Sequence, residues 1–141
     1  MLGLKTGQAP ITVAALLISA SAGFAGACDR VSALEAFASS GTPPAGAACT
    51  TYQGQSRRAG VSCHWTFTFR ADAANTQAAD LWSSLKDCRA GAELGPDAQV
   101  NHPDSYDLRE WSAGRDIYRV SVKDKGALGE TLVFFRYENG G

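Results

Sequence analysis

Polar and apolar side chains alternate along residues 61–70. One face of this run is apolar and carries Val61, Cys63, Trp65, Phe67 and Phe69. The other face carries Ser62, His64, Thr66, Thr68 and Arg70. A repeat of two residues is typical of a half-buried β-strand, because successive side chains of a strand point to opposite faces of the sheet.

The spacing of apolar residues changes to three and four directly after this strand. Residues 72–88 carry a single apolar stripe, formed by Ala74, Ala78, Leu81, Trp82, Leu85 and Cys88. This pattern predicts a helix with one buried face. Residues 29–39 predict a shorter helix with a stripe of Val31, Leu34, Phe37 and Ala38, which ends before Pro43 and Pro44.

Four further segments favour strands: 49–52, 106–111, 117–123 and 131–137. The first would form a hairpin with the strand at 61–70, whereas residues 89–101 predict a loop because of Gly91, Gly95 and Pro96. The last strand is apolar on both faces, so we expect it in the centre of the sheet. The whole order predicts an α+β fold: an antiparallel sheet of four to five strands, with two helices packed on one face and two disulfides.

The first 27 residues predict a secretory signal peptide. Lys5 is the only charged residue before a small and apolar run at 11–24, and Ala25-Gly26-Ala27 matches a processing site. A transmembrane anchor is the competing interpretation, but the run is shorter than the roughly 20 apolar residues that a span needs. We therefore expect a periplasmic or secreted protein whose residues 28–141 form a single α+β domain, with no integral membrane span after cleavage.

The four cysteines, Cys28, Cys49, Cys63 and Cys88, all follow the predicted cleavage site. An even number in an exported chain predicts two disulfides. Lipidation of Cys28 is an alternative, but it would leave an odd thiol. A strand of about 23 Å followed by a returning helix of about 24 Å would bring Cys88 beside Cys63. This favours 63–88 with 28–49, and the alternative is 49–63 with 28–88.

Charge is nearly balanced, with 13 basic and 14 acidic side chains. The longest basic run is the pair Arg57-Arg58. From this run we expect neither a nucleic-acid partner nor a phosphate-binding surface.

His102 lies in a polar loop with Asp104 and Asp107, and this loop is the leading candidate for chemistry. A carboxylate beside an imidazole suggests a small hydrolase that uses His102 with Asp104 or Asp107. The simpler interpretation is a turn that Pro103 fixes and Asp104 caps. Metal-ligand spacing is lacking, so we expect neither a metal nor another cofactor.

Trp111 shares a strand face with Arg109 and would be a binding anchor if exposed, or the cap of a sheet edge if buried. The predicted outward face of the sheet is polar and carries His64, Thr66, Arg70, Arg119 and Lys123. These features favour a small exported, disulfide-containing domain that is a non-catalytic binding or accessory protein of the cell envelope, with an envelope protein as partner. The alternatives are the hydrolase and an envelope inhibitor or stabilising factor that docks by a sheet edge.

Overall fold

The computed structural model describes residues 3, 26, 28–95, 98–100 and 106–141. Its helices are α1 (Asp29–Ser40) and α2 (Asp72–Cys88), with short 3₁₀ turns η1 (Gln55–Arg57) and η2 (Gly126–Leu128). Its strands are β1 (Ala48–Gln53), β2 (Ala59–Thr68), β3 (Ala92–Glu93), β4 (Ala98–Val100), β5 (Tyr106–Ala113), β6 (Asp116–Lys125) and β7 (Glu130–Glu138). The predicted signal peptide lies outside the described residues, apart from residues 3 and 26.

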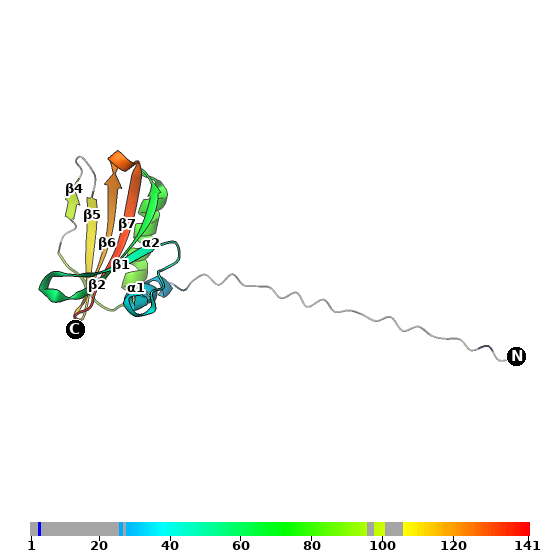
Figure 1. The fold of residues 1–141 in the computed structure, drawn as a ribbon, viewed down its shortest axis with the longest axis horizontal. Coiled ribbons are helices and arrows are strands. Elements are labelled where there is room, and N and C mark those ends of the chain that lie inside the picture. Colours follow the sequence, from blue (N-terminus) through cyan, green and yellow to red (C-terminus); the bar gives the residue numbers. More distant parts are fainter. Residues whose placement is uncertain (1–2, 4–25, 27, 96–97, 101–105) are drawn as a thin grey trace.

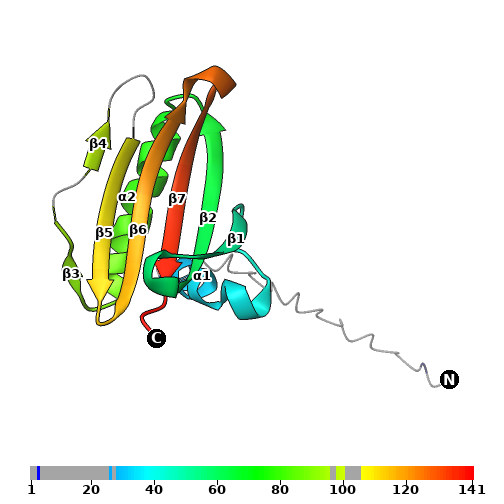
Figure 2. The same cartoon turned by 60° about the vertical axis from the view of Figure 1, so that its left-hand side comes forward.

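All the described strands join one open antiparallel sheet (Figures 1 and 2). The strand order is β1-β2-β7-β6-β5-β3, and β4 also pairs with β5. The predicted α+β class and the central position of β7 are confirmed. The short strands β3 and β4 were missed, because they lie where glycine and proline predicted a loop. Two and three residues carry too little periodicity to be found.

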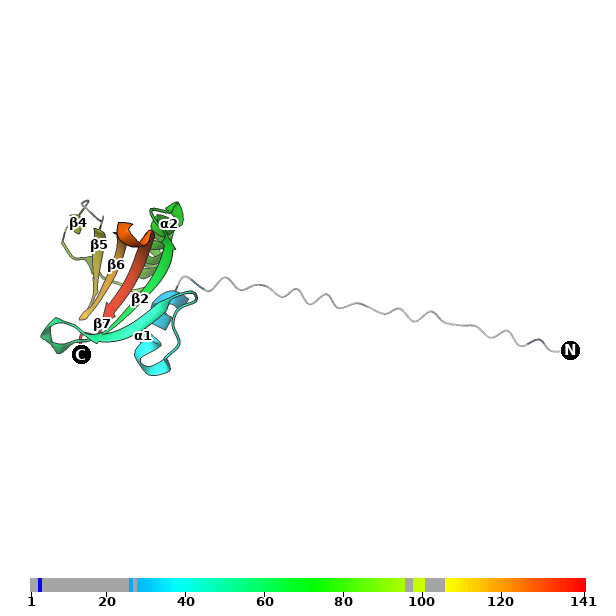
Figure 3. The ribbon, with the colours of Figure 1, turned by 45° about the horizontal axis from the view of Figure 1, so that its top comes forward.

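Both helices pack on the same face of the sheet, as Figure 3 shows. The helix α2 lies over β6 and β7, and α1 lies against β2 and α2. The apolar stripe of α2 is buried at Leu81 and Leu85, and that of α1 at Leu34. These side chains meet the alternating apolar residues of β2 and β7 in a continuous core. Neither α1 nor α2 lies over the other face of the sheet.

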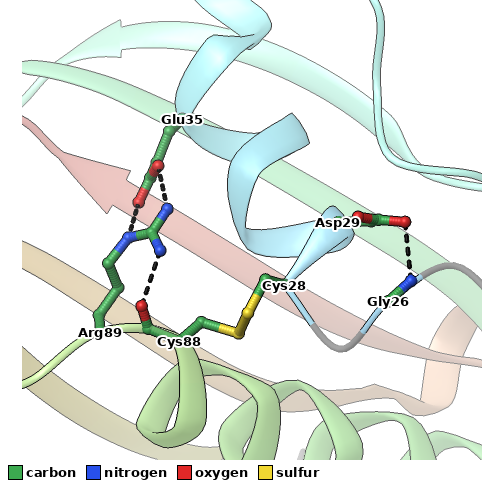
Figure 4. Close-up of a disulfide and its surroundings, with 6 residues drawn as sticks. All are labelled: Gly26, Cys28, Asp29, Glu35, Cys88 and Arg89. Carbon is green, nitrogen blue, oxygen red and sulfur yellow. Dashed lines mark hydrogen bonds and ion pairs between the residues drawn. A yellow bond between two sulfur atoms is a disulfide. The ribbon is translucent and has the colours of Figure 1, made fainter.

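The structure corrects the favoured disulfide pairing. The bonds are Cys28–Cys88 and Cys49–Cys63, which is the alternative pairing. Cys49 lies directly opposite Cys63 in the β1–β2 register, with their Cα atoms 4.1 Å apart. The predicted return of α2 along the sheet is right in length, but α2 packs over β6 and β7. Its last residue therefore lies beside the start of α1 rather than beside β2 (Figure 4).

The end of the predicted strand at 61–70 also needs correction. The strand β2 stops at Thr68, and Arg70 adopts a φ of 55° in the turn before α2. Phe69 is exposed rather than buried. Arg70 forms an ion pair of 3.0 Å with the buried carboxylate of Asp124. Arg70 therefore joins β6 to the turn before α2 and does not belong to the outward face on which we expected it.

The hairpin of β1 and β2 bends over one end of the open face (Figure 2). The hydroxyl of Tyr52 donates to Glu138 Oε1 at 3.0 Å and ties the hairpin to β7. The ring of Tyr52 lies flat over Gly60, where an added Cβ would come within 2.5 Å of the ring. Only glycine at position 60 leaves room for this arrangement.

Candidate functional site

Charged side chains form a connected network on the open face of the sheet. Arg119 of β6 donates to Glu110 Oε2 of β5 and to Glu138 Oε1 of β7, each at 2.7 Å. The same Oε1 atom accepts the bond from Tyr52. Burial raises the pKa of the Tyr52 hydroxyl, and its bond to Glu138 raises this pKa further. Arg119 is therefore paired with two carboxylates within the sheet.

Arg136 lies next to this network and has a different environment. It stands directly opposite Arg119 in the β6–β7 register, and cross-strand neighbours of like charge repel each other. Its Nε donates to Ser62 Oγ at 3.2 Å, and its guanidinium lies over the ring of Phe134, 5.1 Å from the centroid. Among the described residues, no carboxylate forms an ion pair with Arg136.

Two hollows share this part of the open face, and Tyr52 and Arg136 line both. The first, called here the Phe134 hollow, has a volume of about 460 Å³ and is lined by Thr50, Tyr52, Ser62, His64, Phe134 and Arg136. The second, the Glu138 hollow, has about 500 Å³ and is lined by Tyr52, Gln53, Gly54, Tyr106, Leu108, Glu110, Arg119, Arg136 and Glu138. Both are open and large enough for a small molecule.

The rings of the Phe134 hollow give it an apolar wall. His64 and Phe134 lie on neighbouring strands with their ring centroids 5.5 Å apart, and both are half-buried. His64 was predicted on the outward face, and the structure confirms that position. Arg136 and Phe134 were not predicted as site residues, because the apolar residues on both faces of β7 predicted only a central strand. The signal was present, since Arg136 and Phe134 alternate with the buried Phe135.

Two of the predicted binding residues, Asp107 and Arg109, lie on the helix-covered side instead. They line a hollow of about 250 Å³ between α2 and β5, together with Asn75, Ala78, Ala79, Trp82, Val120, Ser121 and Val122. The guanidinium of Arg109 lies 4.3 Å from the centroid of the Trp82 ring. Asp107 Oδ1 and Trp82 Nε1 are buried and have no hydrogen-bond partner among the described residues. Ordered water commonly satisfies such atoms.

Trp111 is a packing residue rather than an exposed anchor. Its ring packs edge-on against Trp82, with the centroids 5.8 Å apart. Its Nε1 donates to the carbonyl of Arg89 at 3.1 Å and so joins β5 to the chain after α2. The structure thus favours the second of the two interpretations, in which Trp111 closes the edge of the core.

His102 and Asp104, the other predicted binding residues, lie outside the described residues. The hydrolase hypothesis depends on His102 and stays a prediction. Docking by a sheet edge also stays a prediction. Across residues 28–95, 98–100 and 106–141, no three His, Cys, Asp or Glu side chains are grouped as a metal site would require.

A half-buried polar cluster lies next to the Cys28–Cys88 disulfide, on the helix side (Figure 4). Arg89 donates to both oxygens of Glu35, at 2.7 and 2.6 Å, and the Tyr118 hydroxyl also donates to Glu35. Burial raises the pKa of Tyr118 strongly, and the bond to Glu35 adds to this rise. The cluster joins α1, the end of α2 and β6, so it has a structural role.

The comparisons add no relative from which a function could be transferred. No protein-family model, no curated protein sequence and no solved structure matches this chain. None of the helices in the described part is both long and apolar enough to span a membrane.

Proposed function

We propose that this protein is a non-catalytic binding or accessory protein of the cell envelope, and that it binds a small ligand on the open face of its sheet. The ligand carries an anionic group next to a ring or another apolar group. The anionic group lies at Arg136, and the apolar group lies in the Phe134 hollow.

The observation that carries this proposal is the environment of Arg136. A guanidinium has five N–H donors, and among the described residues the side chain of Arg136 uses one of them, in the bond to Ser62 Oγ. Arg119 has two carboxylates, whereas Arg136 has none among the described residues. The guanidinium of Arg136 also lines both hollows. An anionic ligand would accept from the remaining donors of Arg136, and a carboxylate would accept two parallel hydrogen bonds.

The ring side chains around Arg136 define the rest of the ligand. Phe134 and His64 form one wall of the Phe134 hollow and Tyr52 forms another, so a flat apolar group can be covered on two sides. The hydroxyls of Thr50 and Ser62 add donors and acceptors at the rim. Apolar walls with a few polar groups are typical of small-molecule sites.

The envelope location rests on two independent features. Both disulfides join segments of the folded part, and disulfides persist in oxidising compartments. The residues before Cys28 match a secretory signal peptide.

A dye with the predicted chemistry tests the proposal. Anilinonaphthalene sulfonate carries a fused ring next to an anion, and its fluorescence would be titrated with the oxidised protein. We expect Arg136→Gln to weaken binding about tenfold, since a charge-assisted hydrogen bond contributes about 1.5–3 kcal/mol. Phe134→Ala should weaken binding by a similar factor, because the apolar wall is lost.

Lys86→Gln is the matched control, since it removes one positive charge from the exposed side of α2. This variant should bind the dye as the parent does. Thermal unfolding of each variant would show that the dye is not reporting a loosened core. Equal affinity of the parent and Arg136→Gln would refute the proposal.

A further inference from the structure

A fourth hollow lies beyond the open face, where three segments distant in the sequence meet. It has a volume of about 440 Å³ and is lined by Ser56, Arg57, Arg58, Ala59, Arg115, Asn139, Gly140 and Gly141. We call it the arginine hollow. Its residues come from the loop between β1 and β2, the turn between β5 and β6, and the chain after β7. Figures 1 and 2 show the loop of the β1–β2 hairpin beside the end of β7.

Three arginines line this hollow, and none of them forms an ion pair with a carboxylate of the described residues. The ion pairs of the described part involve Arg70, Arg89, Arg109 and Arg119. Asp116 is the nearest acidic residue in sequence, and among the described residues its carboxylate bonds to Gly140, which lines the hollow, but to none of the three arginines. It accepts from the backbone N–H of Gly140 at 2.9 Å and from the Tyr137 hydroxyl at 3.4 Å.

Contacts within the fold hold the arginines in this arrangement. Arg58 Nη1 donates to the carbonyl of Arg115 at 2.9 Å, which fixes the hairpin loop against the β5–β6 turn. A Cβ added at Gly140 would lie 2.3 Å from the carbonyl oxygen of Arg115, so the chain after β7 also approaches this turn closely. The hollow is therefore built by tertiary contacts and does not depend on one flexible loop.

The backbone of the hairpin loop is strained at two residues in this geometry. Ser56 and Arg57 both adopt positive φ angles, 61° and 60°, in a loop closed by the bond from Gly54 N–H to the Arg58 carbonyl. Left-handed conformations cost roughly 1 kcal/mol or more for residues other than glycine. Glycine would be the relaxed choice at position 57, yet the chain has an arginine there.

We propose that the arginine hollow binds a phosphate group, either as a free phosphate or as part of a lipid headgroup. A phosphate offers several acceptor oxygens and up to two negative charges, and arginine presents its donors in a fork that matches such oxyanions. A carboxylate has only two oxygens and one charge, so it can satisfy fewer of the three guanidinium groups. The site is separate from the open-face ligand site and stands without it.

The distribution of charge supports this site. The whole chain has a net charge of −1, so the three arginines form a local positive region on a protein that is otherwise almost balanced. Such a region attracts anions over about one Debye length, roughly 8–10 Å at moderate salt. In the sequence the longest basic run is the pair Arg57-Arg58, and from it we expected no phosphate-binding surface. Arg115, brought in by the fold, changes that expectation.

Calorimetric titration of the oxidised protein with inorganic phosphate at low salt tests the proposal, with acetate as the matched monovalent anion. We expect saturable binding of phosphate and at least tenfold weaker binding of acetate. In a second arm, vesicles of phosphatidylcholine with and without phosphatidic acid are sedimented with the protein. Binding to phosphatidic acid vesicles without binding of free phosphate would identify the headgroup as the source. Binding in neither arm would overturn the proposal, as would equal binding of acetate.

The double variant Arg57→Gln/Arg115→Gln should weaken phosphate binding more than tenfold. Arg30→Gln on α1 removes a charge elsewhere and should bind phosphate as the parent does. Backbone amide shifts of the parent protein provide a second readout that needs no variant, and phosphate should move Ala59 and Gly140. Arg136→Gln should leave phosphate binding unchanged, so failure of the open-face proposal is distinguishable from failure of this one. If free phosphate binds in the calorimeter, unmoved amides at both positions would also overturn the proposal.

Discussion

The two faces of the sheet are formed by the same strands, but they differ in burial and in the side chains they carry. On the helix-covered face, β7 contributes Phe135, which is 0% exposed and packs among the apolar stripes of α1 and α2. On the open face, the adjacent Phe134 is half-buried and lies between His64 and Arg136. Both disulfides lie on the covered side, since Cys49 and Cys63 share a face with the core residues. One face therefore supplies stability, and the other is free to bind.

The largest difference between the two faces is expected when Phe135 and Phe134, which are adjacent in β7, are each replaced by alanine. Phe135→Ala should lower the free energy of unfolding by about 3–5 kcal/mol, because it opens a cavity in the core. Phe134→Ala should cost only about 1 kcal/mol, since it removes a partly solvated ring. Chemical denaturation of both variants measures the difference. Equal losses would mean that the open face also belongs to the core.

The two disulfides provide a second comparison, within the covered side. On the chain-entropy model the Cys28–Cys88 disulfide, with a sequence separation of 60, stabilises the fold by about 4 kcal/mol. The Cys49–Cys63 disulfide, with a separation of 14, stabilises it by about 3 kcal/mol. We expect C28A/C88A to be the less stable of the two double variants under urea denaturation. It should also loosen α1, which would show as faster amide exchange at Leu34. Protection at Leu34 that matches the parent would contradict this expectation.

The loss of stability at alkaline pH should depend more on Tyr118, on the covered side, than on Tyr52, on the open face. Burial and the bond to Glu35 raise the pKa of Tyr118, so the folded protein keeps this proton when the unfolded chain, with a pKa of about 10, loses it. Stability from this group is therefore full below about pH 10 and falls as pH rises further. Tyr118→Phe should flatten the alkaline decline in stability.

Tyr52→Phe serves as the comparison on the open face. The pKa of Tyr52 is also raised, chiefly by burial and then by its bond to Glu138. Because Tyr52 is only half-buried, its substitution should flatten the decline less than that of Tyr118. Urea denaturation midpoints measured between pH 8 and pH 11 or thereabouts would record both effects. The reverse ranking would show that the burial of the two hydroxyls has been misjudged.

The smallest effects are expected from outward side chains that no helix covers. Thr66→Ala and Lys123→Gln should change stability by no more than about 0.5 kcal/mol, as is usual for surface positions without special contacts. Thermal unfolding suffices to measure this. A loss above about 1.5 kcal/mol at either position would show that another element packs on the open face.

Much of the fold could be predicted because its elements are long and strictly periodic. The helix α2 was predicted with its observed bounds, since six apolar residues share one stripe and the preceding strand has a different period. The central place of β7 followed from its two apolar faces. The faces of β2 were predicted correctly as far as Thr68, where the strand ends because the chain turns at Arg70.

The disulfide pairing could not be settled from the lengths of two elements. Equal lengths place Cys88 at the same height as Cys63, but they say nothing about which strands the helix covers. The lateral position of α2 depends on packing against β6 and β7, which follow it in the sequence. The register of the β1–β2 hairpin, which puts Cys49 opposite Cys63, depends on a loop of irregular conformation.

The candidate sites were the least predictable part, because each is assembled across strands. Arg136 lies opposite Arg119 of the neighbouring strand, which its own sequence neighbours do not reveal. The arginine hollow requires contact between Arg115 and Arg58, which are 57 positions apart in the sequence. Asp107, predicted with the His102 loop, and Arg109, predicted with Trp111, share one face of β5, and both line the hollow under α2. Periodicity assigns a residue to a face, whereas the topology decides which residues of that face meet.

The position of β7 has a consequence for how the chain reaches its final state. This strand follows all the other strands in the sequence, yet it lies between β2 and β6 in the sheet. During synthesis the β1–β2 hairpin and the β5–β6 hairpin can each form locally, but they cannot be joined until β7 has left the ribosome. Until then the inner edges of both hairpins are unpaired and prone to aggregate. Insertion of β7 between the two hairpins is therefore the step that completes the sheet.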